Sequence, residues 1–282
     1  MSSDAPPPIH LEATDGVSLA LHHLGGEGPP LLFVHATGFN ARTYGPFVAP
    51  LARHYTVWGP DLRAHGWSTG PANGNFSWDR LAVDLLTVVD HLELEHGTVL
   101  GVGHSVGAAL LLLADVQRPG LLCRSYGYEP VMWRPGEAFG PGENPLIASA
   151  AKRKEVFANR AEAMERFAAR PPFSTVRADA LLSYVTNAFE DLEDGTVRLR
   201  CRGVDEAATY DGERVSTSDR ITGVQARITI GKGADDGFGN LGIPAFEALP
   251  NAVLRVHEDL GHFGPLQAPD RLATDALAAL AD

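Results

Sequence analysis

Residues 99–109 read VLGVGHSVGAA, an apolar run followed by a serine between two glycines and a row of small residues. This pattern predicts a buried strand over 98–102 and a tightly packed helix over 106–114. A serine hydroxyl is a weak nucleophile, so it needs an exposed position, a nearby base and donors for the charge it develops. A Gly-x-Ser-x-Gly turn supplies the position, because Gly103 and Gly107 stand where a Cβ would collide with neighbouring backbone. Ser105 is therefore the candidate nucleophile.

Apolar runs and helical patterns alternate on both sides of this stretch. Residues 9–13 and 17–24 flank an Asp-Gly turn and predict an antiparallel hairpin. Further strands are expected over 31–35, 55–59, 122–128, 226–230 and 253–256, and helices over 42–53, 77–92 and 269–280. Such alternation predicts an α/β fold, with a mostly parallel, doubly wound sheet of about eight strands.

The alternation stops between residues 133 and 220. Apolar spacing there predicts long helices over 147–169 and 176–189, a short extended piece over 197–201 and a shorter helix over 205–210. We expect a helical cap over 133–220, inserted between two parts of the core at 1–132 and 221–282. An independent domain is the less favoured alternative, since the segment is short and returns directly to the sheet.

The serine turn and the sequence Gly261-His262-Phe263 near the end of the chain together resemble the α/β-hydrolase family. The resemblance implies that Ser105 is a nucleophile and that His262 is its base. It also implies a triad acid in the glycine-rich turn after residues 226–230, where Asp236 fits best and Asp235 is in reserve. The order serine, acid, histidine along the chain is the order that such hydrolases use.

A second candidate acid, Glu129, follows from its own position. It comes directly after the predicted strand 122–128. Parallel sheets place their ligands at the carboxyl ends of their strands, which is where this carboxylate would lie. The acid therefore stays open among Asp236, Asp235 and Glu129.

The resemblance extends to two loops. In the first, Thr37 matches the residue whose backbone N–H holds the oxyanion, and Ala36 replaces a glycine. Val106 would supply the second N–H. His35 is predicted to anchor this loop by hydrogen bonds. In the second loop, at 61–68, charge-assisted hydrogen bonds between Asp61 and Arg63 are expected, and Ala64 again replaces a glycine.

Several large side chains are expected near the ligand end of the sheet. Because most of them are aromatic, they favour a partly apolar acyl or alcohol group, with packing between sheet and cap as the alternative role. These candidate substrate-binding residues are Phe39, Trp67, His104, Trp133 and Phe263.

These features predict a serine hydrolase that cleaves an ester, lactone or thioester through an acyl-enzyme. A carbon–carbon bond hydrolase of the same architecture is the nearest rival. A ligand-binding, receptor-like protein that retains a slow triad is an alternative from another class. None of these needs a metal or an organic cofactor, and no His/Cys cluster has metal-ligand spacing.

Composition narrows the class of partner. The chain has 282 residues and a net charge of −12, and it has no block of Lys and Arg, which argues against nucleic acid. The polar start lacks the pattern of a secretory signal and no stretch predicts a membrane span, so a cytoplasmic location is expected. Cys123 and Cys201 are predicted to be free thiols. A small-molecule substrate is expected, and the oligomeric state, monomer or homodimer, stays open.

Overall fold

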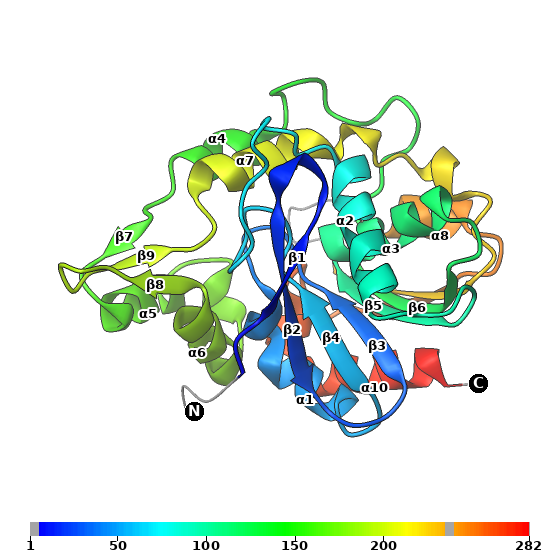
Figure 1. The fold of residues 1–282 in the computed structure, drawn as a ribbon, viewed down its shortest axis with the longest axis horizontal. Helices are drawn as coiled ribbons and strands as arrows, with labels where there is room; N and C mark the ends of the chain where they lie inside the picture. Colours follow the sequence, from blue (N-terminus) through cyan, green and yellow to red (C-terminus); the bar gives the residue numbers. More distant parts are fainter. Residues whose placement is uncertain (1–5, 235–239, 282) are drawn as a thin grey trace.

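The computed structural model describes residues 6–234 and 240–281. In this part of the chain, eight strands form one sheet in the order β1-β2-β4-β3-β5-β6-β10-β11 (Figure 1). The edge strand β1 (Ile9–Glu12) pairs antiparallel with β2 (Ser18–Gly25), as the predicted hairpin requires, and β2 pairs antiparallel with β4 (Thr56–Pro60). All other neighbours run parallel, namely β4 with β3 (Pro30–Val34), then β5 (Val99–His104), β6 (Leu122–Tyr128), β10 (Arg227–Gly233) and β11 (Val253–His257). The predicted α/β fold is confirmed.

Helices cover both faces of this sheet. On one face, α2 (Trp78–His91) packs against α3 (Val106–Gln117), and α8 (Ile243–Ala248) adds Ala245 to the same core. On the other face, α1 (Gly45–Leu51) packs against α10 (Pro269–Leu280). Strand β3 shows the consequence, since its successive side chains enter opposite cores: Leu32 and Val34 on the first face, Leu31 and Phe33 on the second.

The segment between β6 and β10 forms a separate layer beside the large sheet (Figure 1). Its three strands form a small antiparallel sheet in the order β7-β9-β8. Its elements are α4 (Pro145–Ala151), β7 (Val156–Phe157), α5 (Arg160–Ala168), α6 (Ala178–Asn187), β8 (Phe189–Asp191), β9 (Val197–Leu199) and α7 (Gly203–Asp211). Short 3-10 helices complete the described chain: η1 (Thr14–Gly16), η2 (Ala41–Tyr44), η3 (Phe173–Thr175), η4 (Gly212–Val215) and η5 (Ser218–Ile221).

One helix predicted in this segment is wrong. Instead of a single helix over 147–169, the chain forms α4 and α5 with β7 between them. The side chain of Asn159 accepts a hydrogen bond from the backbone N–H of Glu162 and so caps a new helix. The intervening Val156 and Phe157 pair with β9, about 40 residues later. Apolar spacing within a window cannot reveal such a distant partner.

Two further expectations concern the whole chain. Cys123 and Cys201 are both free thiols, as predicted. Among residues 6–234 and 240–281, no helix is both long and apolar enough to cross a membrane.

Candidate active site

Ser105 occupies the sharp turn between β5 and α3. Its backbone is left-handed, with φ 55° and ψ −119°, which is a strained conformation for a residue with a Cβ. A Cβ on Gly103 would lie 2.5 Å from the Ala108 backbone nitrogen, and one on Gly107 would lie 2.2 Å from the Val34 carbonyl oxygen. The two glycines therefore allow the close packing of β3, β5 and α3 that holds the turn, as the sequence predicts.

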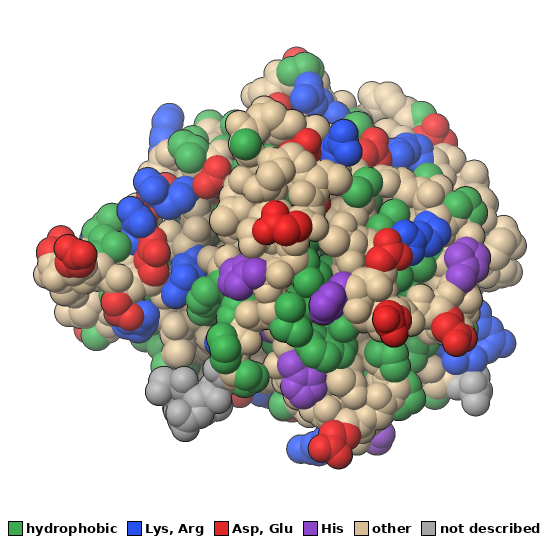
Figure 2. Space-filling view, viewed as in Figure 1, with side chains coloured by type: hydrophobic (Ala, Val, Ile, Leu, Met, Phe, Trp, Pro, Cys, Tyr) green, Lys and Arg blue, Asp and Glu red, His purple; other side chains and the backbone are tan. Residues whose placement is uncertain are grey.

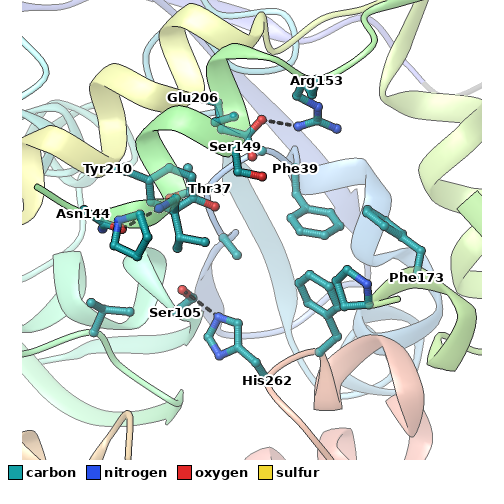
Figure 3. Close-up of a pocket in the computed structure, with 18 of the residues that line it drawn as sticks. Thr37, Phe39, Ser105, Asn144, Ser149, Arg153, Phe173, Glu206, Tyr210 and His262 are labelled. Carbon is teal, nitrogen blue, oxygen red and sulfur yellow. Dashed lines mark hydrogen bonds and ion pairs between the residues drawn. The ribbon is translucent and has the colours of Figure 1, made fainter. Parts of the chain in front are cut away.

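A hydrogen-bonded row runs from Ser105 through His262 to Glu129 (Figure 3 shows the first contact). His262 lies in the turn between β11 and α9 (Gly264–Gln267). Its Nε2 is 3.2 Å from Ser105 Oγ, and its Nδ1 is 2.6 Å from Glu129 Oε2. Because a carboxylate only accepts, Nδ1 carries the proton and Nε2 is left to accept the proton of the serine hydroxyl. All three side chains are buried.

Glu129 reaches His262 from the carboxyl end of β6. Its backbone is left-handed, with φ 47°, and its N–H donates to the carbonyl of Gly231 at 2.9 Å. The free carboxylate oxygen, Oε1, accepts from the Gly233 N–H at 2.8 Å. The structure thus brings the second-ranked sequence candidate to His262. Asp236 and Asp235, the first-ranked pair, lie outside the described residues.

The loop after β3 passes beside Ser105. Thr37 lines the same cavity as Ser105, and its backbone N–H makes no hydrogen bond to any other described residue. The left-handed residue of this loop is Gly38, with φ 81°, so Ala36 does not need that conformation. Val106, directly after Ser105, begins α3, whose N-terminus carries partial positive charge. Thr37 thus lines the cavity into which Ser105 opens, and Val106 directly follows the serine; their role as N–H donors stays a prediction.

His35 anchors this loop, as predicted. Its Nδ1 donates to the Ala36 carbonyl at 2.8 Å, and its Nε2 accepts from the Leu62 N–H at 3.0 Å. Burial, with the nearby His65 as a second cause, lowers the pKa of His35 to about 4. The ring is therefore neutral and is occupied by structural hydrogen bonds.

His104 does not line the pocket, which corrects the sequence prediction. It is 1% exposed, and both ring nitrogens are engaged. Nε2 donates to the His262 carbonyl at 2.8 Å, and Nδ1 accepts from the Tyr44 hydroxyl at 2.7 Å. Burial and the neighbouring His262 lower the pKa of His104 well below its ordinary value. His104 thus supports the backbone of the candidate base.

The loop at 61–68 is tied together by different partners from those predicted. Asp61 accepts from His22 Nε2 and from the backbone N–H groups of Ala41 and Trp67, each at 2.9 Å. Arg63 instead forms a two-pronged pair with Asp84, at 2.8 Å for both contacts. Asp61 and Arg63 are both buried and charged, so each needs a partner, and each has a different one. Their spacing in the sequence could not show which partners these are.

A cavity of about 720 Å³ lies between the sheet and the segment after β6. The predicted residues Phe39, Trp133 and Phe263 line it, whereas Trp67 lies elsewhere, under the guanidinium groups of Arg42 and Arg200. In Figure 3, Ser105 and His262 lie on one side of the cavity, opposite the Arg153–Glu206 ion pair, with Phe39 and Phe173 along one wall.

The sequence prediction missed the wall residues that come from the inserted segment. They include Arg153, Phe167, Phe173, Glu206 and Glu213. No motif surrounds them, so only the folded chain brings them together. In the part of the chain that the structure describes, no three His, Cys, Asp or Glu side chains converge as a metal site.

Residues 31–276 match the family model described as the alpha/beta hydrolase family. This chain belongs to the alpha/beta hydrolase family. The match extends over most of the sheet and over the segment inserted between β6 and β10.

Individual relatives of this alpha/beta hydrolase differ in how much of it they match. The 2-hydroxymuconate semialdehyde hydrolase of Pseudomonas putida is 26% identical over 268 residues, covering 89% of this chain and 86% of the relative. Protein Rv2715 of Mycobacterium tuberculosis, which is uncharacterized, is 32% identical over 120 residues; the match spans 43% of this chain but only 34% of the relative's length. The crystal structure of E-2-(acetamidomethylene)succinate hydrolase has a TM-score of 0.79 at 20% identity, covering 97% of this chain and 99% of that one. At that identity the structural likeness shows the fold.

Proposed function

We propose that this chain is a serine hydrolase that cleaves an ester, lactone or thioester of a small, partly apolar substrate. The proposal rests on two hydrogen bonds in series. His262 Nε2 is 3.2 Å from Ser105 Oγ, and His262 Nδ1 is 2.6 Å from the Glu129 carboxylate. Ser105 and His262 both line the cavity. A nucleophile hydrogen-bonded to a base that is oriented by a third group is the arrangement that acyl transfer requires.

The reaction follows from these positions. His262 Nε2 takes the proton of Ser105 as Oγ attacks the substrate's carbonyl carbon, and the backbone N–H groups of Thr37 and Val106 hold the resulting oxyanion. The oxyanion collapses, the bond to the leaving group breaks, and His262 gives that group the proton. Water then attacks the acyl-serine, with His262 again as base, which releases the acid and restores Ser105.

We assign the acid of the triad to Glu129. An ionised Glu129 holds the proton of His262 on Nδ1 and stabilises the imidazolium that forms during attack. The Gly233 N–H fixes the other carboxylate oxygen, so the carboxylate cannot turn away from His262. This assignment replaces Asp236, which the family resemblance favoured.

We also propose that residues 133–220 act as a cap over the reacting groups. Side chains from α4, α5, α7 and η3 line the cavity that contains Ser105. A segment in this position excludes water and selects the substrate by shape. The large sheet and its covering helices come from the described residues on either side of this segment, 6–132, 221–234 and 240–281.

A carbon–carbon bond hydrolase is the second candidate. Its support is the 2-hydroxymuconate semialdehyde hydrolase, which matches 89% of this chain. Such a reaction would use the same Ser105 and His262, so the site's geometry does not separate the two. A side-by-side trial of a methyl ester and a semialdehyde ring-cleavage product, with kcat/KM as the measure, separates them.

The test of the proposed function uses a short-chain p-nitrophenyl ester and a serine-directed phosphonate. Wild-type protein should hydrolyse the ester and lose activity when one equivalent of phosphonate binds. Ser105→Ala should lower kcat by about 10⁴-fold or more and abolish labelling. Ser174→Ala, which changes an exposed serine of η3, is the matched control and should behave as wild type. Folded wild-type protein that is neither active nor labelled would refute the proposal.

A further inference from the structure

The cavity has the opposite charge balance from the chain as a whole. The chain has 35 acidic and 23 basic side chains, and the two kinds are interspersed on the face of the molecule that Figure 2 shows. Among the described residues that line the cavity, the balance is reversed. Five are basic and two are acidic, namely Lys152, Arg153, Lys154, Arg166 and Arg170 against Glu206 and Glu213.

Two of these cations already have partners. Arg153 forms an ion pair with Glu206 and donates to the Tyr184 hydroxyl at 3.0 Å (Figure 3 shows the ion pair). Lys154 pairs with Glu162 at 2.5 Å and lies 4.7 Å above the ring of Phe157. Neither charge needs a ligand, because each is balanced within the inserted segment.

The other three cations, Lys152, Arg166 and Arg170, form no ion pair with any described acidic residue. Two acids lie on the same helix as Arg166: its sequence neighbour Glu165, and Glu162, one turn earlier, which accepts from Lys154 and from the Ala158 N–H. The charge of Arg166 helps to lower the pKa of Glu162, but the two side chains form no ion pair. Lys152 and Arg170 are exposed and Arg166 is half-buried. Since all three also line the cavity, they lie where it opens to solvent.

Helix stability accounts for only part of this arrangement. Arg166 is in the last turn of α5, where a cation interacts favourably with the helix dipole. Lys152 is the C-cap residue of α4, and Arg170 lies two residues past the end of α5, so both also lie near a helix C-terminus. The dipoles of two different helices do not explain why all three cations line the same cavity. Like charges that line one cavity repel one another, and an anion bound among them relieves that repulsion.

A row of aromatic rings joins this opening to the candidate base. The His262 ring lies 5.9 Å from Phe263, Phe263 lies 5.6 Å from Phe173, and Phe173 lies 4.8 Å from Phe167, centroid to centroid. Phe167 is the neighbour of Arg166 in α5. The apolar row is therefore several ring widths long and ends at Phe167, the sequence neighbour of Arg166.

From this juxtaposition we propose that the substrate is anionic at one end. Its reacting carbonyl lies at Ser105, an apolar arm follows the rings, and a carboxylate or phosphate group lies among Lys152, Arg166 and Arg170. This inference rests on the proposed function for the position of the reacting carbonyl. The cations attract either kind of anion, so a carboxylate probe tests the charge itself.

The experiment compares methyl octanoate with the monomethyl ester of octanedioic acid, which differ only in the terminal carboxylate. Wild-type protein should prefer the charged ester in kcat/KM, mainly through KM. In the double variant Arg166→Gln/Arg170→Gln the ratio of charged to neutral ester should fall by about tenfold, as expected for the loss of two partly exposed ion pairs. The preference should also weaken between about 20 mM and about 500 mM salt, because ions screen exposed charges.

A matched control separates this local effect from net charge. Arg53→Gln/Arg227→Gln removes two exposed arginines that lie outside the cavity and form no ion pair with a described acid, and its ratio should equal that of wild type. An unchanged ratio in Arg166→Gln/Arg170→Gln, or an equal fall in the control, would overturn the inference.

Binding of the same two esters to Ser105→Ala, measured by calorimetry, gives the charge comparison without turnover. If no ester is hydrolysed by the wild type but the charged ester binds more tightly, the proposed function fails and the anionic site stands. If both esters are hydrolysed and bound equally well, the function stands and the anionic site fails.

Discussion

The floor of the cavity and its outer wall are built in different ways. The floor, with Ser105, Glu129 and His262, lies at the carboxyl ends of sheet strands and is fixed by backbone contacts, such as the Gly233 N–H on Glu129. The wall comes from the inserted segment and is held by side-chain pairs, such as Arg153 with Glu206. The floor contains the candidate nucleophile, base and acid, whereas the wall surrounds the rest of the cavity. Changes in the floor should therefore alter the rate of reaction, and changes in the wall should alter binding and stability.

The largest expected effect is at Glu129 in the floor. In Glu129→Gln the side chain can no longer accept from both the Gly233 N–H and His262 Nδ1, because its amide NH₂ only donates. His262 is then driven toward the tautomer with its proton on Nε2, which cannot take the proton of Ser105. We expect kcat for ester hydrolysis to fall by about 10³- to 10⁴-fold.

Asp236→Asn is the decisive comparison for that prediction. It removes the carboxylate that the family resemblance favoured, and we expect it to retain most of the activity. Thermal unfolding of both variants checks that each is folded. If Asp236→Asn loses the activity while Glu129→Gln keeps it, the assignment of Glu129 is wrong.

A smaller effect is expected at Glu213 in the wall. Burial, opposed by a hydrogen bond from Asn144 Nδ2 at 2.7 Å, raises the pKa of Glu213 to about 7. Between its ordinary pKa and pH 7 the folded state holds a proton that the unfolded state has lost, so the free energy of unfolding falls as pH rises through this range. Glu213→Gln removes this loss and still accepts from Asn144. It should match wild type at pH 5 and exceed its stability by up to about 3 kcal/mol at pH 8.

Urea unfolding at the two pH values measures this difference. Glu193→Gln is the matched control, because Glu193 is an exposed glutamate of the same inserted segment. Its stability relative to wild type should not depend on pH. An equal pH dependence in wild type and Glu213→Gln would show that this carboxyl group is not the source of the effect.

The sequence predicted more of the floor than of the wall. The turn around Ser105 was predictable, since only glycine fits at 103 and 107. The strand 122–128 and the helix 269–280 have the predicted bounds, because their patterns repeat over many residues. The choice of acid was not predictable: two strand ends each carry a carboxylate, and which one meets His262 depends on the paths of turns far apart in the chain.

Few features of the wall could be predicted from the sequence. The predicted helix over 147–169 failed because β7 pairs with β9, a contact that no local pattern reports. The clustering of Lys152, Arg166 and Arg170 on one cavity could not be predicted either, since charged residues on or beside a helix are ordinarily solvated. His104 was misplaced for a related reason. Its neighbour Ser105 faces the cavity, but a sharp turn sends adjacent side chains in different directions, and His104 points toward Tyr44.

The smallest expected effect concerns backbone strain at Ala64, in the loop at 61–68. Ser105 and Ala64 are both left-handed, with φ of 55° and 60°, but only Ser105 has a role that requires it. Ala64→Gly relieves the strain at the cost of a buried methyl group and greater freedom in the unfolded chain. The net gain should be about 0.5 kcal/mol in the free energy of unfolding, with kcat unchanged. Ala278→Gly, at an exposed position in α10, should instead lose about 0.5–1 kcal/mol. Urea unfolding distinguishes the two signs, and a loss of stability at both positions would mean that the methyl group of Ala64 outweighs its strain.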